Sequence, residues 1–192
     1  MYVIPSSRFL AQLKIFEGFK PLPYTCPAGK ATIGYGTNLE AQTFFIPYAD
    51  VRARVTRGDL SGKALVLVLK KRGMHWTAKD AESAMLTEVL DTRDQLEQRC
   101  PAYSALVARD EHIRAEALLD MAYNMGVGHA PHGGSQGSGL LGFFSFLPRM
   151  ERGEFEQAAQ GLTGTAWYRQ VGRRARAITR QIRTGAYNDP DL

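Results

Sequence analysis

The first twenty residues contain a helical pattern of apolar positions. Three apolar side chains in the stretch SSRFLAQLKIFEGF recur every three or four residues: Phe9, Leu13 and Phe16. This spacing predicts one amphipathic helix, with Ser6 or Ser7 able to cap its beginning and Gly18 suited to its end. We therefore expect Glu17 on the last turn of this helix.

Two short strands are predicted next, at residues 24–26 and 31–35, because strand-forming residues there flank the turn-forming sequence Pro27-Ala28-Gly29-Lys30. A hairpin of this kind brings Cys26 and Thr32 close together across the two strands. The carboxyl group at the end of the preceding helix and these two side chains are then expected to face one cleft.

The segment 38–72 has no consistent period, since Pro47 interrupts an aromatic run and charged residues are mixed with aliphatic ones. Its last part, residues 60–70, fits either a strand or a helix. We expect the whole segment to complete a small β-containing lobe that covers about residues 18–75.

A longer helix is predicted from Thr77 to about Arg99. The sequence Thr77-Ala78-Lys79-Asp80 is typical of a helix start with an acidic residue in the first turn, and Pro101 stops the helix. Apolar side chains at helical spacing follow that start: Ala81, Met85, Leu86, Val89, Leu90 and Leu96. We expect this helix to connect the small lobe to a larger one.

Helical patterns dominate the remainder of the chain. Residues 109–125 predict a helix whose apolar face is typical of a protein core rather than of a cofactor site. That face comprises Ile113, Ala117, Leu118, Met121, Ala122 and Met125. An apolar pattern resumes at residues 140–150, and residues 153–159 open a further helix. The low-complexity stretch HAPHGGSQGS, residues 129–138, fits either a mobile rim over the cleft or an engineered linker.

These elements together predict a mostly helical α+β protein. We expect one domain, residues 1–192, in which about 18–75 form the small β-hairpin lobe, 77–99 the connecting helix, and 1–17 with 100–192 a helical lobe. The composition, 44% hydrophobic and 22% charged, is typical of such a domain. No segment approaches the roughly 18 consecutive apolar residues of a membrane span. The N-terminus also lacks the basic and then apolar pattern of a secretory signal.

The net charge of +5 is concentrated near the C-terminus. The segment 166–192 contains two aspartates and six arginines: Arg169, Arg173, Arg174, Arg176, Arg180 and Arg183. Its excess of positive charge leaves the rest of the chain nearly balanced. A basic helix favours an anionic partner such as nucleic acid, a lipopolysaccharide surface or acidic wall polymers. For most of these arginines, a solvated helix face is the commoner explanation.

The cysteines and histidines favour neither a disulfide framework nor a metal site. Cys26 and Cys100 lie in no zinc-binding spacing, and we expect both to be free thiols. His129 and His132 are three residues apart in the glycine-rich stretch, where a solvated loop is a commoner explanation than a metal site. We expect no metal and no other cofactor.

The spacing of three residues resembles a known catalytic segment. Glu17 is followed nine residues later by Cys26 and six residues after that by Thr32, which begins the sequence TIGYG. This order is similar to that of the T4-type phage lysozymes and endolysins, glycoside hydrolase family 24. Most of that family has Asp at the middle position, and the resemblance implies that Cys can occur there. It also implies that Gly36, at the end of TIGYG, contacts substrate.

Two further blocks strengthen the resemblance. The segment LLDMAYNMG is similar to the central buried helix of the family, which implies that Tyr123 lines the sugar cleft beside Asn124. A core aromatic and a helix cap are the alternative explanations. The segment TAWYRQVGRRARAITRQIRTGAY is similar to the family's closing pattern, which implies that Arg174 pairs with the catalytic Glu. The matching blocks are residues 9–37, 113–126 and 140–187.

Cleavage of a glycosidic bond needs an acid at the leaving oxygen and a second group that manages water or the developing positive charge. The helix dipole and the flanking phenylalanines oppose ionisation of Glu17, which would suit a general acid, whereas pairing with Arg174 favours the ionised form. Which effect prevails is open. Cys26 and Thr32 would hold the attacking water in an inverting reaction. Attack by a Cys26 thiolate on the anomeric carbon, in a retaining reaction, is the less favoured alternative.

The resemblance implies an endolysin that hydrolyses β-1,4 bonds between N-acetylmuramic acid and N-acetylglucosamine in peptidoglycan and lyses a bacterial host. It implies a monomer with no nucleic-acid partner, and the Arg-rich C-terminal helix adds an anionic outer-membrane surface as a candidate partner. We expect the protein to remain in the host cytoplasm until it is released to the periplasmic wall. Two alternatives stay open: a lytic transglycosylase, which leaves an anhydro sugar, and a non-catalytic cationic protein that binds wall or membrane.

Overall fold

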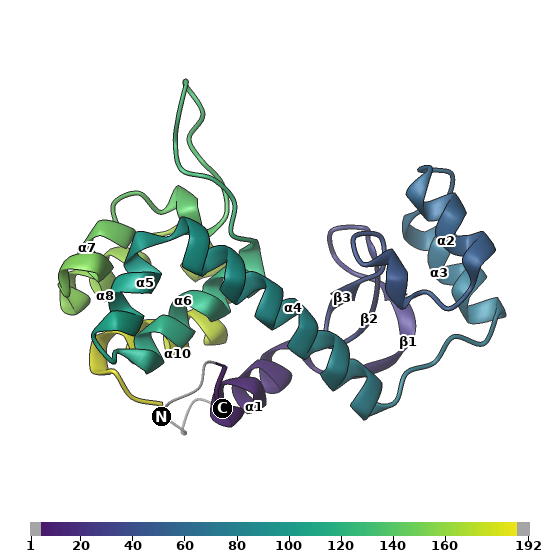
Figure 1. Ribbon diagram of the computed structural model, residues 1–192, viewed down its shortest axis with the longest axis horizontal. Coiled ribbons are helices and arrows are strands. Elements are labelled where there is room, and N and C mark those ends of the chain that lie inside the picture. The colour runs from purple at the N-terminus through teal and green to yellow at the C-terminus, as the bar shows by residue number, and fades with distance from the viewer. Residues whose placement is uncertain (1–4, 188–192) are drawn as a thin grey trace. The chain divides into compact units, whose positions relative to one another are not determined.

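The computed structural model describes residues 5–187 (Figure 1). The chain divides into two compact units, which we name the hairpin unit (Lys14–Thr87) and the helical unit (Met1–Leu13 with Glu88–Leu192). Two helices contribute residues to both units: α1 (Ser7–Glu17) and α4 (Ala78–Arg99). Helices dominate, and one small antiparallel sheet accompanies them, which confirms the predicted α+β class.

A three-stranded antiparallel sheet organises the hairpin unit, with the strand order β1-β2-β3. The elements of this unit after α1 are β1 (Lys20–Thr25), β2 (Ala31–Gly34), β3 (Thr37–Asn38), the 3-10 helix η1 (Thr43–Phe45), α2 (Ala49–Thr56) and α3 (Gly62–Lys71). Strand β1 contains Pro21 and Pro23. It tolerates them because it lies at the edge of the sheet, where a residue without an N–H does not interrupt a ladder on both sides.

The predicted hairpin is confirmed, with its boundaries shifted. The first strand begins at Lys20 instead of Tyr24, and its pairing register with β2 shifts between these two residues. It ends at Thr25, so Cys26 lies directly after the strand, in the turn. Across the sheet, Tyr24 pairs with Thr32.

Residues 60–70, for which the sequence left strand and helix open, form most of helix α3. One face of this helix is buried, at Leu65, Val66 and Leu69. Lys70 and Lys71 lie exposed at its end, so the helix is amphipathic. Helix α3 packs against strands β1 and β2.

Helix α4 is confirmed over nearly the predicted range. Its apolar stripe buries Ala81, Met85, Val89 and Leu96, but Leu86 is 38% exposed, so the prediction that Leu86 belongs to this stripe was wrong. The residue lies one position beyond Met85 and therefore points about 100° away from it around the helix. No helix among residues 5–187 combines the length and the apolarity of a membrane span.

The elements of the helical unit after α4 are α5 (Pro101–Ala108), α6 (His112–Met125), the 3-10 helix η2 (Leu140–Gly142), α7 (Leu147–Arg152), α8 (Phe155–Thr163), α9 (Ala166–Val171) and α10 (Arg173–Thr184). Helix α6 lies at the centre of this unit, because residues 115–122 are all buried and the helix contacts α5, α10 and η2. It confirms the helix predicted at residues 109–125, although it begins at His112.

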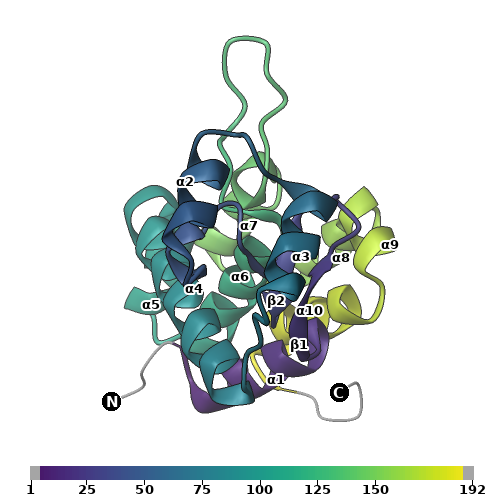
Figure 2. The ribbon, with the colours of Figure 1, turned by 90° about the vertical axis from the view of Figure 1, so that its right-hand side faces the viewer.

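The glycine-rich stretch 129–138 forms a narrow hairpin. Isolated antiparallel bridges join His129 to Ser138 and His132 to Ser135. Figures 1 and 2 show this hairpin projecting from the rest of the helical unit. A Cβ at Gly128 would lie 1.9 Å from the Ser138 carbonyl oxygen, so the base of the hairpin requires glycine there.

Candidate active site

Glu17 is the last residue of α1, and the chain turns directly after it. Gly18 has a φ of 66°, a left-handed conformation that favours glycine, and its N–H donates to the Lys14 carbonyl at 3.0 Å. These features confirm the predicted end of the helix. The Glu17 side chain is half-buried, so the helix end holds it in place while leaving part of it accessible.

Gly36 lies beside the Glu17 carboxyl group. A Cβ at Gly36 would be 3.1 Å from Glu17 Oε2, and the φ of Gly36 is 92°. A side chain here would therefore crowd the carboxyl group and strain the backbone. The ring of Phe19 packs against that of Tyr35 at a centroid distance of 5.5 Å, yet Phe19 is 39% exposed. Phe19 is therefore expected to exclude water from Glu17 only in part.

Cys26 begins a tight turn between β1 and β2. Its N–H donates to the Lys30 carbonyl at 2.9 Å, and its own carbonyl accepts the Gly29 N–H at 2.8 Å. Gly29 has a φ of 81°, which suits glycine. The turn fixes the backbone of Cys26 while its side chain stays partly exposed.

Thr32 is brought to Cys26 by the hairpin, as predicted. Its side chain is only 3% exposed, and its hydroxyl donates to the Lys30 carbonyl at 3.1 Å. The same hydroxyl also acts to lower the pKa of the Cys26 thiol. Because a hydroxyl carries one proton, donation to Lys30 and donation to a Cys26 thiolate are alternatives. Thr32 can therefore respond to the charge of Cys26.

The turn favours the thiolate form of Cys26. Partial burial acts to raise the pKa of the thiol, but hydrogen bonds from the Lys30 backbone, the Thr32 hydroxyl and the Ala28 and Cys26 backbones outweigh it. The net effect is a pKa below the ordinary value of the thiol. A lowered pKa gives the group more negative charge near neutral pH than an unperturbed cysteine carries.

Tyr24 joins this set, although the sequence analysis did not identify it. Burial, then the negative charges of Glu17 and Cys26, raise the pKa of the Tyr24 phenol. Its hydroxyl therefore lies within electrostatic reach of both residues. Strand alternation could have indicated it, because Tyr24 and Cys26 are two residues apart and Tyr24 pairs directly with Thr32.

Glu40 is a second residue that the sequence analysis missed. Its carboxylate accepts the Ala31 N–H at 2.9 Å and the Gly62 N–H at 2.8 Å, and it pairs with the Lys30 ammonium at 3.1 Å. No local pattern could have indicated it, because Gly62 is 22 residues away in sequence.

Tyr123 and Asn124, predicted to bind substrate, make contacts within the helical unit. The Tyr123 hydroxyl donates to Glu88 Oε2 at 3.2 Å, and the Asn124 side-chain oxygen accepts the Trp167 indole N–H at 3.1 Å. Tyr123 is half-buried and Asn124 is exposed. The alternative of an Asn124 helix cap was wrong, because Gly126 is the C-terminal cap of α6. Contact with substrate stays a prediction for both.

Arg174 is 6% exposed in helix α10, and its Nε donates to Asp120 Oδ1 at 2.6 Å. A guanidinium so deeply buried requires charged or polar partners. Its predicted pairing with Glu17 stays a prediction.

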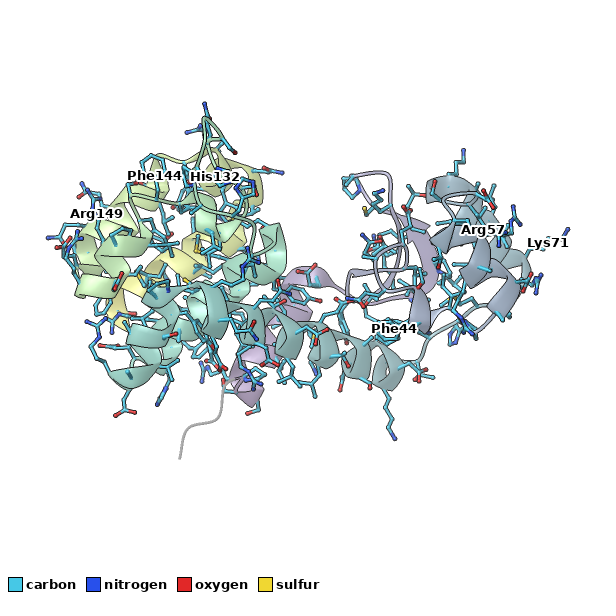
Figure 3. The ribbon with its side chains drawn as sticks, turned by 45° about the horizontal axis from the view of Figure 1, so that its top comes forward. Phe44, Arg57, Lys71, His132, Phe144 and Arg149 are labelled. Atoms are coloured by element: carbon cyan, nitrogen blue, oxygen red, sulfur yellow. The ribbon has the colours of Figure 1, made fainter. Side chains whose placement is uncertain are left out.

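Both cysteines are free, as expected. Within the described range 5–187, no three or more His, Cys, Asp or Glu side chains are grouped in a way that could hold a metal ion. His129 and His132 lie in the projecting hairpin, where Figure 3 shows His132 near the tip.

A helix that ends at a half-buried Glu, followed by an antiparallel hairpin and a separate helical unit, is the arrangement expected of a lysozyme-like hydrolase. The family model described as Phage lysozyme matches residues 14–184. This match covers most of the chain, so the chain belongs to the phage lysozyme family. It is therefore a lysozyme-type hydrolase whose substrate is peptidoglycan.

Proposed function

We propose that this lysozyme hydrolyses the β-1,4 bond between N-acetylmuramic acid and N-acetylglucosamine, with Glu17 as the general acid. One observation carries the proposal: Glu17 and Cys26 both act on the same phenol. Burial and then the negative charges of these two residues raise the pKa of Tyr24, and the hairpin brings Thr32 to Cys26. An acid and a second, negatively chargeable group are the two components that glycosidic cleavage requires.

In the proposed reaction, the Glu17 carboxyl donates its proton to the leaving glycosidic oxygen as the bond to the anomeric carbon breaks. A water molecule held by Cys26 and Thr32 attacks the anomeric carbon from the opposite face. The Cys26 thiolate accepts a proton from this water and then releases it to solvent, and the Glu17 carboxylate regains a proton from solvent, so both groups return to their starting state. The lowered pKa of Cys26 supports this role, because only a thiolate can accept the proton.

Two other outcomes of bond cleavage remain distinguishable. In a retaining reaction, the Cys26 thiolate would instead attack the anomeric carbon and form a glycosyl thioether that water then hydrolyses. In a transglycosylase reaction, the muramic acid O6 hydroxyl would replace water and leave a 1,6-anhydro end. We favour direct attack by water because Thr32 adds a hydroxyl that can donate and accept beside the thiol.

The test is mass spectrometry of the soluble products released from purified sacculi by the wild-type protein and by Glu17→Gln. We expect reducing N-acetylmuramic acid ends from the wild type and a loss of rate of about 10²–10⁴-fold in the variant. Anhydro ends would show that the enzyme is a transglycosylase and not a hydrolase. Intact sacculi with wild-type protein would favour a non-catalytic cationic binder, and an active Glu17→Gln would remove Glu17 from the role of acid.

We propose host lysis as the biological outcome: a monomer that stays in the host cytoplasm until it is released and then digests the periplasmic wall. An anionic outer-membrane surface is a proposed further partner. Its support is that Arg169, Arg173 and Arg176 are exposed in the C-terminal segment, whereas Arg174 is buried. We expect their combined replacement by Gln to weaken sedimentation with anionic lipid vesicles.

The hairpin unit offers the matched control for this binding test. Although the charges outside the C-terminal segment nearly balance, this unit exposes cations of its own. Figure 3 shows Arg57, directly after α2, and Lys71, at the end of α3, at the surface. Gln at Lys63, Lys70 and Lys71, all exposed in α3, removes three positive charges there, as many as the arginine variant loses. An equal loss of vesicle binding in both variants would show that net charge, and not the position of the arginines, determines binding. No loss in the arginine variant would contradict the proposed partner.

A further inference from the structure

The peptide group between Lys30 and Ala31 connects Cys26 and Thr32 to the carboxylate of Glu40. The carbonyl of Lys30 accepts both the Cys26 N–H, at 2.9 Å, and the Thr32 hydroxyl, at 3.1 Å. The N–H on the other side of the same peptide group, that of Ala31, donates to Glu40 Oε1 at 2.9 Å. A peptide group is planar, so fixing the direction of its N–H also fixes the direction of its carbonyl.

Glu40 is itself held from three directions. The Oε1 atom that binds Ala31 also accepts the N–H of Gly62, the first residue of α3, at 2.8 Å. The other oxygen, Oε2, pairs with the Lys30 ammonium at 3.1 Å, and the side chain is only 12% exposed. A carboxylate at a helix N-terminus is further favoured by the helix dipole. Glu40 therefore ties the start of β2 to the start of α3.

The turn itself packs against this same helix start. A Cβ at Gly62 would lie 2.9 Å from the Gly29 carbonyl oxygen, so the turn and α3 meet backbone to backbone. Burial acts to raise the pKa of Glu40, but hydrogen bonds from Ala31, Gly62 and Lys30 outweigh it and lower the pKa below its usual value. Glu40 is therefore ionised near neutral pH.

We propose that Glu40 is a positioning residue that sets the geometry of Cys26 and Thr32 through the Lys30–Ala31 peptide. The role of Glu40 in catalysis rests on the proposed function, whereas its effect on the reactivity of the Cys26 thiol does not. Without Glu40, this peptide can rotate, so the Lys30 carbonyl no longer fixes the Cys26 N–H and the Thr32 hydroxyl, and the turn whose N–H groups lower the pKa of the Cys26 thiol loosens.

Three variants separate the contributions of the carboxylate. Glu40→Gln keeps an oxygen that can accept both backbone N–H groups but loses the charge that faces Lys30. Lys30→Met removes the same ion pair from the other side and leaves the Lys30 backbone in place. Glu40→Ala removes all three interactions, and Glu40→Asp, whose side chain is one methylene shorter, is the substitute if the alanine variant does not fold.

The first readout is the pH dependence of Cys26 alkylation by iodoacetamide in the Cys100→Ser background, which needs no enzymatic activity. We expect the alkylation profile of Glu40→Ala, or of Glu40→Asp, to move to higher pH by about one pH unit. Glu40→Gln and Lys30→Met should move it much less. Val51→Ala, a core substitution in α2 of the same unit, controls for lost stability and should leave the profile unchanged.

The second readout is turnover of soluble uncross-linked glycan strands. Glu40→Ala or Glu40→Asp should lower kcat by on the order of ten- to a hundredfold with little change in KM, because displacement of reacting groups affects the transition state more than binding. A profile shift in a chain with no hydrolytic activity would uphold the positioning role and overturn the proposed function. An unshifted profile in Glu40→Ala and in Glu40→Asp would overturn the positioning role, whatever the activity.

Discussion

Two clusters of polar side chains in this protein differ in burial, one in each unit. The hairpin unit holds Glu17 and Cys26, both partly exposed, together with the buried Thr32. The helical unit holds a buried network in which Asp120 accepts from Arg174 at 2.6 Å and from Gln12 at 3.4 Å. The residues of the network are between 0 and 6% exposed: Gln12, Asp120, Arg174 and Gln181.

The difference shows what distinguishes a reactive cluster from a structural one. In the buried network, the charge of Asp120 is balanced by Arg174, and the amides of Gln12 and Gln181 bond each other. In the hairpin unit, the environment changes the pKa values of Cys26 and Tyr24, and both residues stay partly exposed. Mutations in the first cluster should therefore alter stability, and mutations in the second should alter activity.

The largest effect on stability is expected from Asp120→Ala. This change removes the carboxylate that pairs with the buried guanidinium of Arg174, which should cost about 3–5 kcal/mol of unfolding free energy. Urea denaturation followed by circular dichroism measures it. A cost below about 1 kcal/mol would mean that the buried network is not structural, and the contrast between the two clusters would fail.

The next effect is expected from Cys26→Ser, this time on activity. Serine keeps a small polar side chain but cannot carry negative charge near neutral pH, so cleavage of sacculi should fall on the order of a hundredfold. Cys26→Asp restores a charged group and should retain most of the rate. The unfolding free energy of both variants should stay close to that of the wild type, and full activity of Cys26→Ser would remove the thiolate from the proposed reaction.

The two thiols should also differ in reactivity. The hydrogen bonds of the turn lower the pKa of Cys26, whereas burial raises the pKa of Cys100. Since the thiolate is the reactive form, alkylation of Cys26 should begin at a lower pH than that of an ordinary cysteine, and Cys100 should react only after denaturation. Peptide mapping after alkylation at several pH values measures both sites. Faster labelling of Cys100 in the folded protein would reverse the assignment.

The smallest effect is expected at an exposed ion pair. Lys14 and Glu82 lie 3.0 Å apart, with side chains 32% and 49% exposed. Water and salt screen such a pair, so Lys14→Ala should change the unfolding free energy by at most about 1 kcal/mol. Thermal unfolding at low and high salt checks this. A cost as large as that of Asp120→Ala would show that burial does not separate the two kinds of ion pair.

Much of the fold followed from short-range pattern. The end of α1 at Glu17, the hairpin and the long helix α4 were all predicted, because helical spacing, turn-forming residues and prolines act on their close neighbours in the chain. Where the pattern of apolar and polar positions was weak, it left the secondary structure open. Residues 60–70 mix aliphatic and charged positions, and only packing against β1 and β2 selects a helix for them.

The sequence by itself determined the order and spacing of Glu17, Cys26 and Thr32, and the hairpin that brings the last two together, because these depend on contacts between near neighbours. Only the tertiary structure decided which distant groups support them. Glu40 meets Gly62 across 22 residues, and Asp120 meets Arg174 across 54. Such partners are selected by how the whole chain packs, and they in turn decide whether a carboxylate is structural or a thiol is ionised.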